Sequence, residues 1–205
     1  MKVMMVNGSP HAGGNTATAL DEMKKIFEAA GVEVNLVHVG NKVVRGCVGC
    51  YRCQSTGKCI FNDVVNESAK IFEEADGLVV GTPVYYASAN ATTIAFLDRL
   101  FFSTSFDKTM KVGAGVVIAR RAGTTATFDE LNKYFSMCGM PIATSQYWNN
   151  AFGLAAGEVA QDLEGLQTMR TLARNMIFLM KSIALGKEQF GLPEREPWTP
   201  THFIR

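Results

Sequence analysis

An excess of charge of either sign is missing from this 205-residue sequence, because 20 Lys and Arg residues face 19 Asp and Glu residues and leave a formal net charge of +1. The basic residues are scattered along the chain and form no stripe. A nucleic-acid surface would need such a stripe, and an acidic partner would need such an excess. We therefore expect no nucleic acid among the partners of this protein.

Long apolar runs are missing too. The most apolar stretch, Met176–Leu185, is shorter than a bilayer span and contains Lys181. The first residues follow a strand pattern directly, without the charged and apolar regions of a signal peptide. We expect no membrane contact and a cytoplasmic location, where thiols stay reduced. The five Cys residues then need a role other than disulfide bonding.

The first loop lacks the two common nucleotide motifs. Val3–Val6 reads as a buried strand that breaks at Asn7-Gly8-Ser9-Pro10, and a helical pattern starts near Asn15. The segment Gly8–Thr16 has no Lys where GxxxxGK[ST] requires one, and it has no GxGxxG. A nucleoside triphosphate or a dinucleotide therefore fits this loop poorly.

A strand that ends in a Gly-rich turn and opens a helix instead suits one phosphate monoester. The first N–H groups of a helix have no partner within it, and the helix dipole places partial positive charge there. Ser9, Asn15 and Thr16 add short side chains that can donate to phosphate oxygens or cap the helix. The loop indicates a mononucleotide such as FMN, and the alternative is an ordinary capped turn.

Strand patterns alternate with helical patterns along the chain. The predicted strands are Val3–Val6, Val32–Val39, Gly77–Gly81, Val112–Ala119 and Pro141–Gln146. The predicted helices start near Asn15, Asp63, Asn90, Thr127 and Glu158. This alternation predicts a parallel sheet with right-handed crossovers and helices on both faces.

Local signals define several boundaries. Thr127 with Glu130 matches a capping box, and Gly186 would stop the last helix after Leu185. Asp98 and Arg99 are expected to form a structural ion pair. The tail, residues 187–205, contains three Pro and has no periodic pattern, so we predict one domain over residues 1–186 and a C-terminal strap that is not a separate domain.

Three irregular segments follow predicted strands: Gly8–Thr16, Thr82–Tyr86 and Arg120–Thr125. Ligands of such sheets bind outside the carboxyl ends of the strands, near the switch in strand order. We therefore expect the three segments to converge on one edge of the sheet.

With these segments the chain resembles the NADPH-dependent FMN reductase family of flavodoxin-like proteins. The likeness is carried by Gly8-Ser9-Pro10 with Gly14-Asn15-Thr16, by Thr82-Pro83-Val84-Tyr85, and by Asp98-Arg99. It implies a flavodoxin-like three-layer α/β/α sandwich with a five-stranded parallel sheet of order 2-1-3-4-5. It also implies an FMN phosphate on the first loop and the isoalloxazine ring against the other two.

The resemblance further implies the cofactor-binding residues. Those for the phosphate are Ser9, Pro10, His11, Gly14, Asn15 and Thr16, and those for the ring are Thr82, Pro83, Val84, Tyr85, Tyr86, Arg120, Arg121 and Gly123. Arg120 and Arg121 depart from many relatives, although a positive group near flavin N1 would stabilise the anionic reduced flavin. No catalytic side chain is expected, because the flavin carries the chemistry.

A compact cysteine segment narrows the likeness. Cys47, Cys50, Cys53 and Cys59 lie within thirteen residues, which resembles the motif of the iron–sulfur flavoproteins, a branch of the same family, and implies a [4Fe-4S] cluster. Zn is an alternative, although structural Zn sites usually use two separated pairs. Reduced thiols that hold no metal are another.

Three functions remain open on the sequence. We favour an NAD(P)H-dependent FMN reductase, which passes electrons to a small acceptor such as a flavin or quinone by hydride transfer through flavin N5. The first alternative is an iron–sulfur flavoprotein that relays single electrons between a ferredoxin-like partner and FMN. The second is a non-enzymatic FMN- or Zn-binding regulatory module. Trp198, Phe203 and Arg205 in the tail suit a homodimer or homotetramer in which a neighbour covers the flavin edge.

Overall fold

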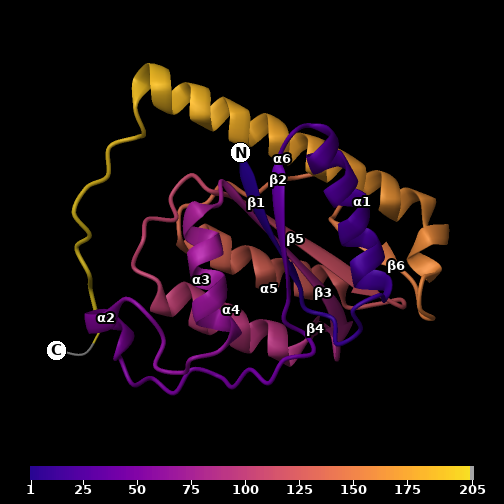
Figure 1. Cartoon of the computed structure of the whole chain (residues 1–205), viewed down its shortest axis with the longest axis horizontal. Helices are drawn as coiled ribbons and strands as arrows, with labels where there is room; N and C mark the ends of the chain where they lie inside the picture. Colours follow the sequence, from indigo (N-terminus) through magenta and orange to yellow (C-terminus); the bar gives the residue numbers. More distant parts are fainter. Residues whose placement is uncertain (204–205) are drawn as a thin grey trace.

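The structure, a computed structural model, describes residues 1–203 and is organised around a parallel sheet (Figure 1). The strands are β1 (Lys2–Asn7), β2 (Glu33–His38), β3 (Gly77–Tyr85), β4 (Ser88–Ala89), β5 (Val112–Ala119) and β6 (Asn150–Phe152). The order is β2-β1-β3-β5-β6, with all of these neighbours parallel, and β4 pairs with β3 in the antiparallel sense. Counting only the parallel strands, this is the predicted order 2-1-3-4-5, which is confirmed; the short β4 was not predicted.

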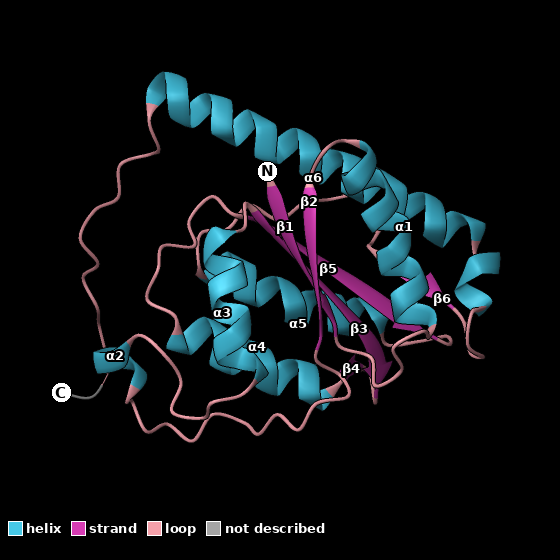
Figure 2. Ribbon diagram, in the orientation of Figure 1, coloured by secondary structure: helices cyan, strands magenta, loops and turns pink. Residues whose placement is uncertain are grey.

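Helices cover both faces of the sheet, as the alternating pattern predicted (Figure 2). One face packs against α1 (Asn15–Ala29) and α6 (Leu163–Phe190), and the other against α3 (Val64–Glu74), α4 (Ala91–Ser103) and α5 (Thr124–Met137). The short α2 (Cys53–Thr56) lies apart from these layers, whereas the 3-10 helix η1 (Glu158–Gln161) contributes the buried Val159 to the core on the α1 and α6 side.

Strand β1 shows how the sequence forms this sandwich. Val3 and Met5 belong to the core on the α1 and α6 side, whereas Met4 and Val6 belong to the core on the opposite side. All four side chains are fully buried. Because side chains alternate across a strand, a continuous apolar run is what a strand covered on both faces requires.

Side-chain caps are found at the predicted starts of two helices. Asp63 precedes α3, and its Oδ1 accepts from the Val65 N–H at 3.1 Å. Asn90 precedes α4, and its Oδ1 accepts from the Thr92 N–H at 2.9 Å. Each cap satisfies an N–H that has no partner within its helix.

The prediction of a strand over Pro141–Gln146 was wrong. Ile142 alone bridges to Gly113, and the chain then turns away through residues 145–149. In that turn the Ser145 hydroxyl donates to Asn149 Oδ1 at 2.8 Å. The Ser145 hydroxyl also lies 2.6 Å from the Tyr147 carbonyl oxygen, and Asn149 Nδ2 donates to the carbonyl of Ala143 at 3.4 Å. Such side-chain bonds to the backbone compete with the ladder, and pairing with β5 resumes in β6.

The predicted capping box was also wrong. Helix α5 starts at Thr124, so Thr127 lies within it and its hydroxyl donates to the carbonyl of Gly123 at 2.9 Å. Glu130 instead accepts hydrogen bonds from Ser88 Oγ and the Ala89 N–H, both at 2.8 Å. A contact across more than forty residues cannot be read from a four-residue pattern.

The last helix differs from its predicted bounds. Residues 158–161 form the separate η1, and α6 runs from Leu163 to Phe190, so Gly186 does not stop it. Gly191, with a φ of 74°, follows its end.

Residues 191–203 contain no helix or strand, and the Arg195 guanidinium donates to Asp107 Oδ1 at 3.3 Å. The division of the chain at residue 186 stays a prediction.

Replacing Gly186 by Ala tests the extent of α6. A Cβ at Gly186 would have no heavy atom within 4 Å, so Gly186→Ala should raise the free energy of unfolding by about 1 kcal/mol in urea titrations. Gly191→Ala is the matched control and should lower it, because a φ of 74° disfavours a side chain. A loss of stability at Gly186 would show that the helix ends there.

Candidate functional site

The loops that follow β1, β3 and β5 lie together at the carboxyl edge of the sheet. The Gly8 N–H donates to the carbonyl of Gly81 at 2.8 Å, which joins the first loop to the end of β3. A Cβ on Gly123 would lie 2.7 Å from the Ala87 Cα, so the third loop touches the second. The expected convergence is therefore observed.

The first loop is held in shape by its own polar groups. The Ser9 N–H donates to Asn7 Oδ1 at 3.0 Å, and the His11 N–H donates to Ser9 Oγ at 3.2 Å. The Gly14 N–H returns to the carbonyl of His11 at 3.4 Å, and His38 Nε2 lies 2.7 Å from the carbonyl oxygen of Ser9. These contacts fix the backbone that leads into α1.

The start of α1 presents donors that the rest of the protein does not use. Within residues 1–203, the N–H groups of Asn15, Thr16 and Ala17 find no acceptor, and the side chain of Thr16, a buried residue, makes no hydrogen bond. The Asn15 side chain, by contrast, donates to the carbonyl of Ala155 at 2.9 Å and accepts from the Val159 N–H at 3.1 Å. Unused N–H groups at the positive end of a helix form an anion site.

The second loop is a tight hairpin between β3 and β4. Tyr86 and Ala87 both have positive φ, 51° and 59°, as a two-residue turn of type I′ requires. Glu130 holds the hairpin through Ser88 and Ala89, as described above. Sequence reasoning missed Glu130, since nothing local marks its distant partner. The Tyr86 side chain projects fully into solvent.

The third loop adds positive charge. Arg120 and Arg121 are exposed, and neither side chain makes a hydrogen bond or ion pair within the described residues 1–203. Gly123, with a φ of 90°, precedes α5 and lets this loop reach the hairpin.

The structure brings the four clustered cysteines to one place. Cys47, Cys50, Cys53 and Cys59 all line a cavity of about 20 Å³. Its other walls are mostly apolar side chains from the same segment and from α4, including Val48, Tyr51, Ile60, Phe61 and Phe102. The Cys53 thiol contacts the carbonyl of Phe102 at 3.8 Å, which places α2 at the end of α4.

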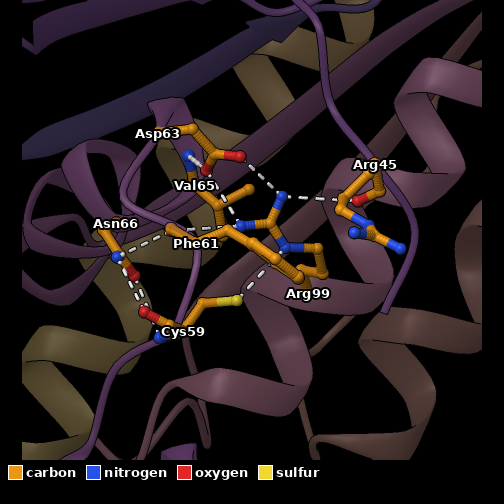
Figure 3. Close-up of polar contacts among 7 residues, drawn as sticks. All are labelled: Arg45, Cys59, Phe61, Asp63, Val65, Asn66 and Arg99. Carbon is orange, nitrogen blue, oxygen red and sulfur yellow. Dashed lines mark hydrogen bonds and ion pairs between the residues drawn. The ribbon is translucent and has the colours of Figure 1, made fainter. Parts of the chain in front are cut away.

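Cys59 is the cysteine with a charged partner. Arg99 Nε donates to Cys59 Sγ at 3.2 Å, and the guanidinium also forms two hydrogen bonds with Asp63, at 2.7 and 2.9 Å (Figure 3). Burial lowers the pKa of the Arg99 guanidinium, but the hydrogen bonds that it donates to Asp63 and Cys59 outweigh this effect and leave the pKa raised. Arg99 therefore stays charged.

The predicted pair of Asp98 with Arg99 was wrong. Asp98 Oδ1 accepts from the Tyr134 hydroxyl at 2.5 Å, on a different side of α4 from the bonds that Arg99 makes to Asp63. Consecutive residues of a helix do not face each other, so neighbours in sequence seldom pair on a helix.

The four thiols share a cavity, but they are not gathered closely around one point. In residues 1–203, no group of three or more His, Cys, Asp or Glu side chains is placed to hold one metal ion, as tetrahedral Zn would need. A cubic cluster keeps its thiolates farther apart than one ion does. The backbone of residues 46–50 makes no hydrogen bond within the described chain and belongs to no helix or strand.

Two adjacent pockets lie between the hairpin and the cysteine segment. A pocket of about 590 Å³ is lined by Tyr85 and Tyr86 from the hairpin and by Gly46 from the cysteine segment. A second pocket, of about 700 Å³, is lined by Cys47. Asp98 and Glu130 line both pockets, so the two are adjacent.

The parallel strands have the order 2-1-3-4-5 and helices cover both faces of the sheet. A loop suited to an anion follows β1, where the strand order switches. These features define a flavodoxin-like α/β protein. The chain belongs to the NADPH-dependent FMN reductase family, which matches residues 1–155. This family binds FMN and consists of flavin oxidoreductases, so the predicted family and the predicted FMN cofactor are confirmed.

Known proteins similar to this chain agree with that assignment. An iron–sulfur flavoprotein of Methanocaldococcus jannaschii is 30% identical over 89% of this chain and 99% of its own length. The structure of RosB with bound 8-demethyl-8-formylriboflavin-5′-phosphate superimposes with a TM-score of 0.72 at 15% identity, covering 100% of this chain and 94% of that one. A flavodoxin from the Archaea superimposes with a TM-score of 0.57 at 15% identity, covering 86% of this chain and 99% of that one.

The helices of residues 1–203 include none with the length and apolar character of a bilayer span.

Replacing Gly123 by Ala tests the contact between the second and third loops. The new Cβ would lie 2.7 Å from Ala87 Cα and 2.9 Å from Val84 Cγ1, at a φ that disfavours a side chain. We expect the free energy of unfolding to fall by about 1–3 kcal/mol in urea titrations. Gly13→Ala is the control, because its Cβ would meet nothing within 4 Å. Equal stability of the two variants would contradict the observed contact.

Proposed function

We propose that this protein is an iron–sulfur flavoprotein that passes single electrons between a ferredoxin-like partner and FMN. The observation that carries the proposal is the shared cavity of Cys47, Cys50, Cys53 and Cys59, which lies beside the two pockets between the cysteine segment and the hairpin. The name of the Methanocaldococcus jannaschii relative supports it. The order of the sequence-based hypotheses is thus reversed, because only this function uses all four thiols.

The first loop is proposed to bind the FMN phosphate. The unpaired N–H groups of Asn15 and Thr16 and the Thr16 hydroxyl would donate to its oxygens, with Ser9, Pro10, His11 and Gly14 shaping the backbone around it. The Asn15 side chain contributes indirectly, because it is engaged with Ala155 and Val159.

The isoalloxazine ring is proposed to lie between the hairpin and the third loop. Residues Thr82–Tyr86 would form one wall, and Arg120 and Arg121, which have no partner within residues 1–203, would place positive charge near the ring. Positive charge there stabilises a reduced, anionic flavin. Bound FMN supplies both one-electron and hydride chemistry, and the protein supplies orientation and electrostatics.

The four cysteines are proposed to hold a [4Fe-4S] cluster, which supplies one-electron chemistry when bound. Val48, Ile60 and Phe61 would keep water from its sulfurs, because they wall the cavity that the thiols share. Burial and hydrogen bonding of the sulfurs are the means by which a protein sets a cluster's reduction potential.

An NAD(P)H-dependent reductase is the second candidate. The pocket of about 590 Å³ beside Tyr85 and Tyr86 is open and large enough for a nicotinamide or a small acceptor such as a flavin or quinone. The family description, NADPH-dependent FMN reductase, supports this candidate. No contact in the structure favours the regulatory module.

Assembly and location are further parts of the proposal. Trp198 and Phe203 are 82% and 101% exposed, which supports a homodimer or homotetramer in which they are covered; Arg205 lies outside the described residues. All five cysteines are free thiols, which supports a reducing compartment such as the cytoplasm.

Metal and flavin analysis after purification without oxygen tests the function. We expect about four iron and four sulfide per chain together with FMN, because four thiolates match one cubic cluster. Changing any of Cys47, Cys50, Cys53 or Cys59 to Ser should bleach the broad visible band of the cluster and leave FMN bound. Cys138→Ser is the control, since Cys138 lies outside the cavity of the four. FMN without iron would leave the reductase as the function.

A pair of threonines tests the phosphate site. Thr16→Val should weaken FMN binding by about 10–100-fold, because a hydrogen bond to a charged phosphate contributes about 1.5–3 kcal/mol. Thr18→Val should leave affinity nearly unchanged, since the Thr18 hydroxyl already bonds to the carbonyl of Gly14 at 3.4 Å. Fluorescence titration of the apoprotein measures both. Equal affinities would remove Thr16 from the site.

A further inference from the structure

The most deeply buried cation of the described chain lies directly behind the cysteine cavity. Arg99 is 1% exposed, and its side chain lines the cavity of the four thiols. Removing a guanidinium from water costs several kcal/mol unless its donors are paired and its charge is balanced. The buried guanidinium of Arg99 therefore needs hydrogen-bond acceptors and a negative charge nearby. These contacts show which parts of the chain Arg99 connects.

All five N–H donors of Arg99 have acceptors (Figure 3). Nε donates to Cys59 Sγ at 3.2 Å, and two donors go to the Asp63 carboxylate. The remaining two go to the carbonyl oxygens of Arg45 and Phe61, each at 3.3 Å. Four of the acceptors are oxygens, and the fifth is the Cys59 sulfur. Because the other four donors are already engaged, the Nε donor is fixed in its direction toward this sulfur.

These contacts join the two ends of the cysteine segment. Arg45 lies two residues before Cys47, and Phe61 lies two residues after Cys59. The Arg99 guanidinium also lies 5.1 Å from the centre of the Phe61 ring. One side chain on α4 therefore closes the base of the loop that carries all four thiols.

Cys59 is fixed at its backbone as well as at its thiol. Its N–H donates to Asn66 Oδ1 and its carbonyl accepts from Asn66 Nδ2, both at 3.0 Å. Cys47 and Cys50 are exposed, and their backbone groups have no hydrogen bonds within residues 1–203. The segment thus has one fixed end at Cys59 and an adaptable stretch around the first two cysteines.

We propose that Arg99 is a positioning residue that holds Cys59 as the fixed ligand of the cluster and raises the reduction potential of the cluster through its N–H···S bond. A donor to a ligating sulfur stabilises the extra electron of the reduced cluster, and hydrogen bonds to sulfur are known to tune such potentials. Asp63 balances the positive charge of Arg99. The rise in the reduction potential is therefore assigned to the hydrogen bond from Arg99 Nε to Cys59 Sγ. This inference rests on the proposed function.

Lys cannot replace Arg99 in this role. A guanidinium presents donors in a rigid planar fork, whereas an ammonium is a compact point charge on a flexible stem. Lys at position 99 could keep an ion pair with Asp63, but it could not also bond to Cys59, Arg45 and Phe61 in the observed directions. Arg99→Lys therefore keeps the charge and removes the geometry.

A spectroscopic measurement on the unaltered protein tests the contact first. Protein labelled with ¹⁵N at arginine is purified without oxygen, reduced to the paramagnetic state of the cluster, and studied by pulsed EPR for ¹⁵N hyperfine coupling. We expect a coupling from one arginine nitrogen. Its absence in cluster-loaded protein would overturn the proposal, whether or not any variant folds.

The potential of the cluster tests the consequence. Arg99→Lys should favour the oxidised cluster about tenfold more than the unaltered protein does, which lowers the one-electron potential by about 59 mV. Arg45→Lys is the matched control, because its exposed guanidinium lies over the same Phe61 ring at 4.9 Å and contacts no thiol; it should change the equilibrium less than twofold.

Two negative outcomes are distinguishable. Unaltered protein that contains FMN but no iron would refute the proposed function and this inference with it. Cluster-loaded protein whose Arg99→Lys and Arg45→Lys variants share one potential, with full FMN content as the measure of folding, would refute only the role of Arg99.

Discussion

Full burial of the sheet on both faces is the constraint on which the rest of the structure depends. Val3 and Met5 face one layer of helices, Met4 and Val6 face the other, and none of the four is exposed. Polar groups that bind a ligand therefore cannot be placed on the faces of the sheet. It is concentrated at the carboxyl ends of β1, β3 and β5, where the chain leaves the sheet and backbone N–H groups are free to bind a ligand.

The cysteine segment lies outside the sheet and has almost no regular structure of its own. A segment of this kind needs an external support to bring four thiols to one cavity. The support comes from α4, whose Arg99 reaches Cys59 and both ends of the loop, and from α3, whose capping residue Asp63 balances the charge of Arg99. The cap of one helix thus also neutralises a buried cation of the next.

Much of the fold could be predicted because local patterns determine it. The apolar runs of β1, β3 and β5 and the helix starts near Asp63 and Asn90 are visible in short stretches of sequence. The strand order came from the family resemblance, because no local pattern encodes it. The clustering of the four cysteines could also be expected, since they are close in sequence.

The errors have a common physical origin. Glycine is permissive both inside a helix and after its end, so Gly186 could not be distinguished from Gly191 without the backbone conformation. The partners of Glu130 and Arg99 lie about forty residues away, and local patterns favoured nearer ones. Residues 141–146 have the composition of a strand, but a polar turn interrupts its pairing.

A reductive titration without oxygen tests the central claim, that one chain combines FMN with a cluster on its four clustered cysteines. Stepwise addition of a calibrated reductant, followed by visible absorbance and EPR, counts the electrons that each chain accepts. The proposed function predicts about three, two for the flavin and one for the cluster, with an EPR signal from the reduced cluster. An uptake of about two electrons with no such signal would contradict it and leave a flavin reductase with unoccupied thiols.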